Sequence, residues 1–214
     1  KQMNEFRELY AQAPKASVDV RLGDARNLKL RAETIDLVFT SPPYVTALDY
    51  TRAHFLAVAW MQAALGLELD EYRLKGSEYI GSERGRLAES VGNNDQLEGL
   101  DQTNAVLTEL EEQAPRHAKL TRRYFNDMYC VLERIAHALR SRRHAIIVVC
   151  PSHLRQVAVP THEVLAEIGN AHGLRLKFQH TRTISERRRL MPYLREAFGQ
   201  RMDTEYVLVL QKRA

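Results

Sequence analysis

The chain has 214 residues, of which 44% are hydrophobic, and a formal net charge of +4. A chain of this length can bury a sizeable core, and no stretch approaches the apolar length of a membrane span. Its two cysteines, Cys130 and Cys150, have no zinc-binding Cys/His spacing, which argues against a disulfide scaffold and a metal site. A cytoplasmic location fits this cysteine usage, and the weakly basic charge permits nucleic-acid binding.

The first predicted elements are a short helix over residues 1–13 and a strand over residues 18–22, where apolar and polar residues alternate. Gly23 and Asp24 end that strand. The apolar run 35–39 predicts a buried strand, which stops before Pro42 because proline cannot continue a central ladder.

The middle of the chain begins with a largely buried helix predicted over residues 50–72. Residues 75–101 are rich in glycine and charge, and their Gly81–Gly85 segment is predicted to be a flexible loop. The remaining predicted elements are helices over 103–113, 120–140 and 161–171, and strands over 145–150, 174–181 and 205–211.

Strands separated by helices predict an α/β fold with a mostly parallel sheet. The helical and loop-rich part at about residues 50–118 is expected to be an insertion in one domain that spans residues 1–214. Ligands bind beyond the carboxyl ends of the strands in such sheets. Asp24 and the segment 41–44 both follow predicted strands, so chemistry is expected there.

The segment Ser41-Pro42-Pro43-Tyr44 carries the chemistry. Two consecutive prolines make the loop rigid and remove two backbone donors, so its carbonyl groups remain open acceptors. Ser41 adds a side-chain acceptor, and Tyr44 offers an aromatic face to a planar group. A flipped nucleobase with an exocyclic amine would satisfy all three elements.

The segment Thr40-Ser41-Pro42-Pro43-Tyr44 resembles motif IV of the S-adenosylmethionine-dependent amino-methyltransferases, most closely the N4-cytosine DNA enzymes, although some N6-adenine enzymes share it. Upstream, Leu22-Gly23-Asp24-Ala25 resembles motif III of that family. The resemblance covers most of the chain apart from residues 75–118, and it implies a Rossmann-like methyltransferase sheet.

The resemblance also implies roles for single residues. Ser41 and the carbonyl of Pro42 would accept hydrogen bonds from the target amine, beside Pro43, and Tyr44 would stack on the extruded base. The amine nitrogen would then attack the methyl group of S-adenosylmethionine directly. Asp24, Ala25 and Thr40 would contact that cofactor.

Arginines are the candidates for contact with DNA. Arg182 and the run Arg187, Arg188 and Arg189 could bind phosphates, although an arginine run is also typical of a solvated surface. Arg52 could face the substrate or pair with Asp49 or Asp70.

One part of the family pattern has no counterpart in the sequence. The glycine loop that holds the methionine end of the cofactor is not found, and we expect it, with the first strands of the sheet, before Lys1 or in a second polypeptide. The 35–39 strand should then have a free edge that something covers, and the chain alone should not methylate.

Two other functions remain open from the sequence. The chain could act on RNA or on a protein glutamine, whose amine or amide would satisfy the same acceptors. It could also be a non-catalytic, methyltransferase-like subunit that binds nucleic acid, which the missing glycine loop favours.

Overall fold

A computed structural model describes residues 2–12, 16–45, 50–66, 68–76, 78–82, 96–184 and 203–214. Its helices are α1 Gln2–Gln12, the 3-10 turn η1 Ala25–Asn27, α2 Tyr50–Leu65, α3 Leu69–Lys75, α4 Asp101–Gln113, α5 Pro115–Ala138 and α6 Thr161–Ala171. Its strands are β1 Ile35–Thr40, β2 Leu139–Val149, β3 Ser152–Leu154, β4 Val157–Val159, β5 Leu174–Thr183 and β6 Thr204–Lys212. The expected α/β class is confirmed.

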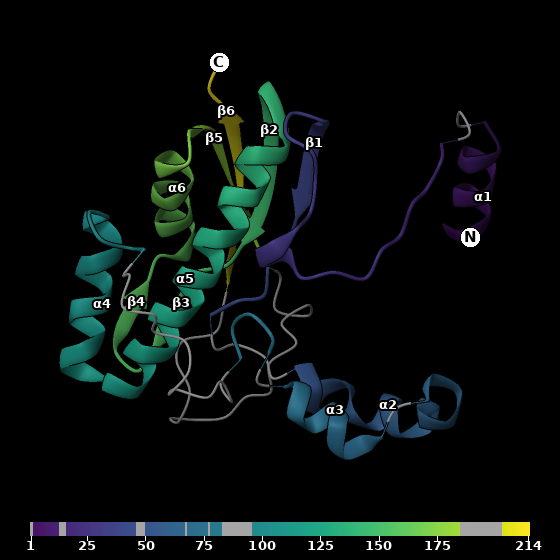
Figure 1. The fold of residues 1–214 in the computed structure, drawn as a ribbon, viewed down its shortest axis with the longest axis horizontal. Helices are drawn as coiled ribbons and strands as arrows, with labels where there is room; N and C mark the ends of the chain where they lie inside the picture. Colours follow the sequence, from purple (N-terminus) through teal and green to yellow (C-terminus); the bar gives the residue numbers. More distant parts are fainter. Residues whose placement is uncertain are drawn as a thin grey trace.

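The main sheet has four strands in the order β1-β2-β6-β5 (Figure 1). β1 is parallel to β2, whereas β6 is antiparallel to both of its neighbours. β1, β2 and β5 therefore run in one direction, and their carboxyl ends meet at one edge. The described sheet is mixed, because β6 pairs antiparallel with both of its neighbours.

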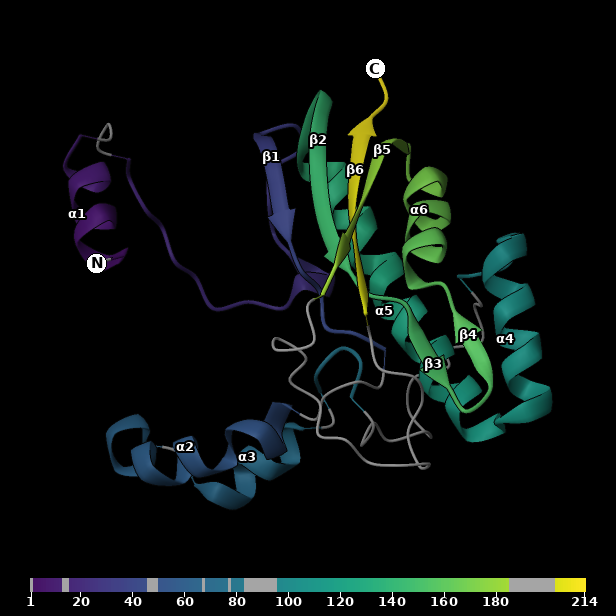
Figure 2. The ribbon, with the colours of Figure 1, turned by 180° about the vertical axis from the view of Figure 1, so that it is seen from behind.

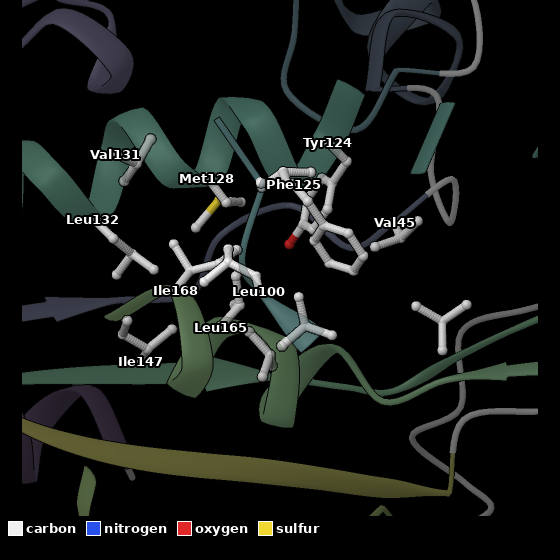
Figure 3. Close-up of a cluster of buried hydrophobic side chains, with 14 of the residues drawn as sticks. Val45, Leu100, Tyr124, Phe125, Met128, Val131, Leu132, Ile147, Leu165 and Ile168 are labelled. Carbon is white, nitrogen blue, oxygen red and sulfur yellow. The ribbon is translucent and has the colours of Figure 1, made fainter. Parts of the chain in front are cut away.

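Helices α4, α5 and α6 lie on one side of this sheet (Figures 1 and 2). The α5 helix begins with Pro115, a residue suited to a first helical turn, and it buries one continuous stripe against the sheet. In Figure 3 the side chains of Phe125 and Met128 on this stripe lie near Leu165 and Ile168 of α6. Alternate residues of β2, including Ile147, complete this core.

The boundary between α5 and β2 differs from the predicted one. The sequence pattern predicts a helix that continues to Arg140, but α5 ends at Ala138, and β2 begins at Leu139. Leu139 pairs with Ile35 of β1, and the Arg140 guanidinium binds the Asp36 carboxylate at 2.8 Å. Leu139 is apolar and lies at helical spacing, so the sequence pattern fits either the end of α5 or the start of β2. Its pairing with Ile35 of β1 places it in the strand.

The predicted strand over residues 18–22 is wrong for this structure, which has no strand between α1 and η1 among the described residues. Val18, Val20 and Leu22 are 82%, 89% and 106% exposed. Alternation predicts a strand only if a neighbouring strand supplies hydrogen-bond partners, and the described residues supply none to this segment. In Figures 1 and 2 it runs away from the β1 edge and ends at α1.

The buried helix predicted over residues 50–72 is also corrected. It is divided into α2 and α3 around Gly66, which has a φ of +60°. The Leu56 and Trp60 side chains of α2 are 76% and 92% exposed. α2 packs against α3, and both helices lie apart from the sheet (Figure 1). An apolar sequence therefore remains on the surface here.

The side of the sheet opposite α5 and α6 carries apolar side chains with little cover. The β-sheet register aligns Phe39, Ile146, Val209 and Phe178 in one row across all four strands. Phe39 is 71% exposed and Phe178 is 58% exposed. We call this side, with Leu37, Val148 and Val207, the open face of the sheet.

Two matched substitutions test whether the open face is uncovered in solution. Phe125→Ala in α5 should reduce the free energy of unfolding by about 3–5 kcal/mol, because it leaves a cavity. Phe39→Ala should reduce it by no more than about 1 kcal/mol, since the Phe39 side chain is largely in water. Urea denaturation of both variants measures the difference. Equal losses would show that the chain in solution covers this face.

Candidate functional site

The carboxyl end of β1 leads directly into Ser41-Pro42-Pro43-Tyr44. Ser41 is exposed, Pro42 is buried, and Pro43 and Tyr44 are half-buried. The next residue, Val45, is 1% exposed and belongs to the core. Its carbonyl oxygen accepts a hydrogen bond from the Ser152 hydroxyl at 3.4 Å. The loop is therefore fixed at both ends, by the β1–β2 pairing and by the burial of Val45, while Ser41 stays accessible.

Gly81 fixes the loop from a second side. It has a φ of +79°, and a Cβ atom at this position would lie 2.8 Å from the Tyr44 carbonyl oxygen and 3.7 Å from the Pro43 side chain. Only glycine fits this approach without displacing the neighbouring backbone. The glycine-rich pattern predicts a flexible loop at Gly81, but the structure places Gly81 against the predicted catalytic segment. Gly85 lies outside the described residues.

The Tyr44 hydroxyl lies among polar groups from the other strands. It donates to Glu205 Oε1 at the start of β6, at 3.4 Å, and hydrogen-bonding contacts link it to Cys150 after β2 and to Ser41. Burial, together with the Cys150 thiol and the Glu205 carboxylate, raises the pKa of Tyr44. Burial also raises the pKa of Cys150. Both groups are therefore protonated at neutral pH.

Arg182 lies opposite Glu205 in the register of β5 and β6, and its guanidinium binds Glu205 Oε2. The Arg182 side chain nevertheless remains 66% exposed. The structure therefore places this candidate phosphate-binding residue at the same edge of the sheet as Tyr44, but with part of its donor capacity already used by a carboxylate.

A second polar cluster surrounds Asp24. The carboxylate caps η1 by accepting the Arg26 backbone N–H at 2.9 Å, and it also binds the Arg26 guanidinium at 2.7 Å. Arg26 further contacts Asp127 of α5 at 3.2 Å and donates to the Glu78 carbonyl at 3.1 Å. Hydrogen bonding to Arg26 lowers the pKa of Asp24, whereas burial raises the pKa of Asp127 despite Arg26. This cluster joins the turn after residue 24 to the segment that contains Gly81.

The other predicted site residues are less closely connected. Thr40 is half-buried and pairs with Ile147 as the last residue of β1. Ala25 is exposed in η1, and Arg52 is exposed in the first turn of α2. Arg187, Arg188 and Arg189 lie outside the described residues.

Sequence reasoning missed Glu205, Gly81 and Arg26 as members of the site. Glu205 had a usable signal, because a carboxylate opening an otherwise apolar strand occupies the edge where ligands bind. Gly81 had none, since its partners are distant in sequence. Arg26 stands two positions after Asp24, but its contacts with Asp127 and Glu78 come from distant parts of the chain.

Two kinds of feature are missing from the described part of the chain. None of its helices is long and apolar enough to cross a membrane. No three His, Cys, Asp or Glu side chains in it converge in a way that could hold a metal ion.

Comparison with known proteins gives similarity to solved structures alone, because no family model and no curated protein matches the chain. Two crystal structures of a candidate DNA modification methylase from Thermus thermophilus are 14% and 15% identical to it, both with a TM-score of 0.43. These alignments cover 90% of this chain and 51% and 53% of the Thermus chain. The same protein complexed with S-adenosyl-L-methionine gives 16% identity and a TM-score of 0.37, over 46% of this chain and 40% of that chain. The chain thus spans about half the length of the first structures that it matches.

Gly81 and Gly99 form a matched pair for testing the contact with Tyr44. Both have a φ near +80°, but a Cβ atom at Gly99 would meet nothing within 4 Å. Gly81→Ala should therefore lose about 1–3 kcal/mol more free energy of unfolding than Gly99→Ala, because it alone adds a steric clash to the shared backbone strain. Thermal and urea denaturation measure both losses. Similar losses would mean that the 78–82 segment does not press on the Tyr44 carbonyl in solution.

Proposed function

We propose that this chain is the catalytic part of an S-adenosylmethionine-dependent DNA amino-methyltransferase that methylates N4 of cytosine in preference to N6 of adenine. The observation that carries the proposal is the geometry of residues 41–44. A proline-stiffened loop leaves the carboxyl end of a sheet strand with Ser41 exposed and Tyr44 half-exposed. Its backbone is fixed by Val45, Ser152 and Gly81.

This loop suits a target amine. The Ser41 hydroxyl and the Pro42 carbonyl accept the two N–H groups of the amine, which draws the nitrogen toward sp³ geometry and frees its lone pair. Tyr44 stacks on the base and holds it in place. The nitrogen forms a bond to the methyl carbon as the bond from that carbon to sulfur breaks, and the amine loses one proton to solvent. Rigid acceptors aimed at one nitrogen stabilise this transfer through position and electrostatics.

The cofactor is proposed to lie between Asp24, Ala25 and Thr40, where it supplies the methyl group. The Asp24 side chain is 49% exposed, so a ligand can reach it, but both of its oxygens already accept from Arg26. A ligand hydroxyl or amine would have to share these oxygens. Among the described residues, no glycine loop follows a strand to hold the methionine end.

A further polypeptide element is therefore proposed to complete the site, supplied by a preceding segment or a second chain. The open face supports this, because apolar Leu37 and Phe39 are 55% and 71% exposed at the free edge strand. An uncovered apolar edge strand favours association with another strand. The same element would carry the missing glycine loop. With it, the chain would act in the cytoplasm on DNA.

DNA contacts are proposed for the candidate arginines. Arg52 and Arg182 expose their side chains, and Arg182 lies at the sheet edge where Tyr44 lies. Arg187, Arg188 and Arg189 follow β5 in the sequence. The alternatives are an RNA or protein-glutamine substrate, or a non-catalytic subunit. Calorimetric titration with S-adenosylmethionine separates the last of these, since a non-catalytic subunit should not bind it even when the completing element is present.

Ser41→Ala tests the chemistry. The variant should fold normally, because an exposed loop hydroxyl adds little to the core, but methyl transfer should fall about 100- to 1000-fold with the loss of one fixed acceptor. Labelled methyl incorporation into DNA by the completed enzyme measures this. Ser141→Ala is the matched control, since Ser141 is exposed near the opposite end of β2 and bonds the Arg213 carbonyl at 3.2 Å. Full activity in Ser41→Ala would remove Ser41 from the mechanism, and robust methylation by residues 1–214 alone would remove the need for a further element.

Arg188→Gln tests the DNA contact. If Arg188 binds a phosphate, the variant should bind all DNA sequences more weakly, and the slope of log K against log salt should fall by roughly 0.9. Fluorescence anisotropy over a salt series measures the slope. Arg122→Gln is the control, because it removes the same charge from an arginine that already pairs with Glu111 at 3.0 Å. An unchanged slope in Arg188→Gln would show that Arg188 does not bind a DNA phosphate, as expected if the arginine run is only a solvated surface.

A further inference from the structure

Glu205 is a carboxylate in a position where its burial costs free energy of folding. It is the second residue of the inner strand β6, whose following residues are mostly apolar, and its side chain is only 11% exposed. A buried carboxylate destabilises a fold unless hydrogen bonds or a cation compensate. Here Arg182 binds one oxygen and the Tyr44 hydroxyl approaches the other at 3.4 Å.

The pairing with Arg182 does not account for this placement. A cross-strand ion pair stabilises a sheet equally well when both partners lie in water, where it contributes about 0.2–1 kcal/mol. The Arg182 side chain is indeed 66% exposed, whereas the Glu205 side chain is 11% exposed and its Oε1 lies 3.4 Å from the Tyr44 hydroxyl. The burial of the Glu205 carboxylate therefore goes with its contact to the tyrosine.

The Tyr44 ring needs such an anchor. Its backbone is fixed by Gly81 and Val45, but these contacts leave the ring free to turn about its side-chain bonds. Contacts of the hydroxyl with Cys150, Ser41 and Glu205 limit this rotation, and Glu205 is the carboxylate among them. A hydrogen bond at the far end of the ring fixes the hydroxyl and thereby the plane of the ring. The raised pKa of Tyr44 keeps the hydroxyl protonated, so it can act as the donor to Glu205.

We infer that Glu205 is a positioning residue that orients the Tyr44 ring to receive the flipped base, with Arg182 holding the carboxylate in place. The inference rests on the proposed function. A ring that is misplaced by about 1 Å can lower the rate about 100-fold, so orientation at this point has a large effect. Glu205 itself does not touch the substrate; it acts through the tyrosine hydroxyl.

The first test measures the contact without requiring activity. Tyrosine is labelled with ring carbon-13 in the full chain, and Tyr44→Phe identifies the Tyr44 resonance by its loss. Glu205→Gln should shift and broaden this resonance and lower the pH at which it titrates. Glu111→Gln, which removes a carboxylate that pairs with Arg122, should leave it unchanged. Glu205→Asp keeps the charge near Arg182 but withdraws it from Tyr44, so it should also shift the resonance if Glu205→Gln does not fold.

The second test measures methyl transfer by the completed enzyme. Glu205→Gln and Tyr44→Phe should each lower kcat about 10- to 100-fold, with KM for S-adenosylmethionine and the melting temperature nearly unchanged. The double variant should be no slower than the slower single variant, because both changes remove one interaction. The inference is overturned if the kcat losses of the two single variants multiply in the double variant. It is also overturned if the Tyr44 resonance keeps its wild-type position in both Glu205→Gln and Glu205→Asp. If the wild-type enzyme transfers no methyl group, the proposed function fails, and the resonance alone decides whether Glu205 positions Tyr44.

Discussion

β1 stops pairing with β2 after Thr40 because Pro42 and Pro43 have no N–H group to offer. The chain must therefore leave the sheet at its carboxyl edge, and the burial of Val45 draws it back into the core five residues later. Between these two fixed points the backbone has little freedom. The accessible Ser41 and the half-exposed Tyr44 both follow from this one constraint.

The sequence was informative where a local pattern alone determines the structure. The strands predicted over 35–39 and 205–211 agree with β1 and β6 within one residue at each end, because their apolar runs are buried in the sheet. The hairpin of β3 and β4 was missed, since three-residue strands leave no periodicity to detect. The segment 18–22 shows the opposite error. Its apolar and polar residues alternate as in a strand, but no neighbouring strand among the described residues pairs with it, and its apolar side chains are exposed.

The candidate site rests on both kinds of information. Ser41 and Tyr44 can be proposed from the sequence because their proposed chemistry depends on adjacent residues, the two prolines. Glu205 and Gly81 reach Tyr44 from elements far along the chain, so the local sequence around Tyr44 does not reveal these contacts. The position of Glu205 near the start of an apolar strand indicates the sheet edge but not its partner. The sequence predicts a cofactor contact for Asp24 but does not indicate its partner Arg26, although the two residues are separated by one position.

The arginines illustrate why net charge is a poor guide to nucleic-acid binding. Arg26, Arg140 and Arg182 all bind carboxylates of the fold, namely Asp24, Asp36 and Glu205. A guanidinium that already holds a carboxylate contributes less to phosphate binding than its formal charge suggests. The exposure of Arg182 still allows a second contact, so its role depends on what approaches this edge.

The open face and the site are parts of one surface. The row of Phe39, Ile146, Val209 and Phe178 is followed, toward the carboxyl edge, by Val148, Val207 and His180. The next residues along β6 and β5 are Glu205 and Arg182, which pair with each other, and Glu205 also contacts Tyr44. An element that covers the apolar rows would therefore end beside Tyr44, where the proposed cofactor loop is needed. The same binding event would then cover the sheet and complete the site. The free energy gained by burying the apolar side chains of the open face would therefore also stabilise the completed site for methyl transfer.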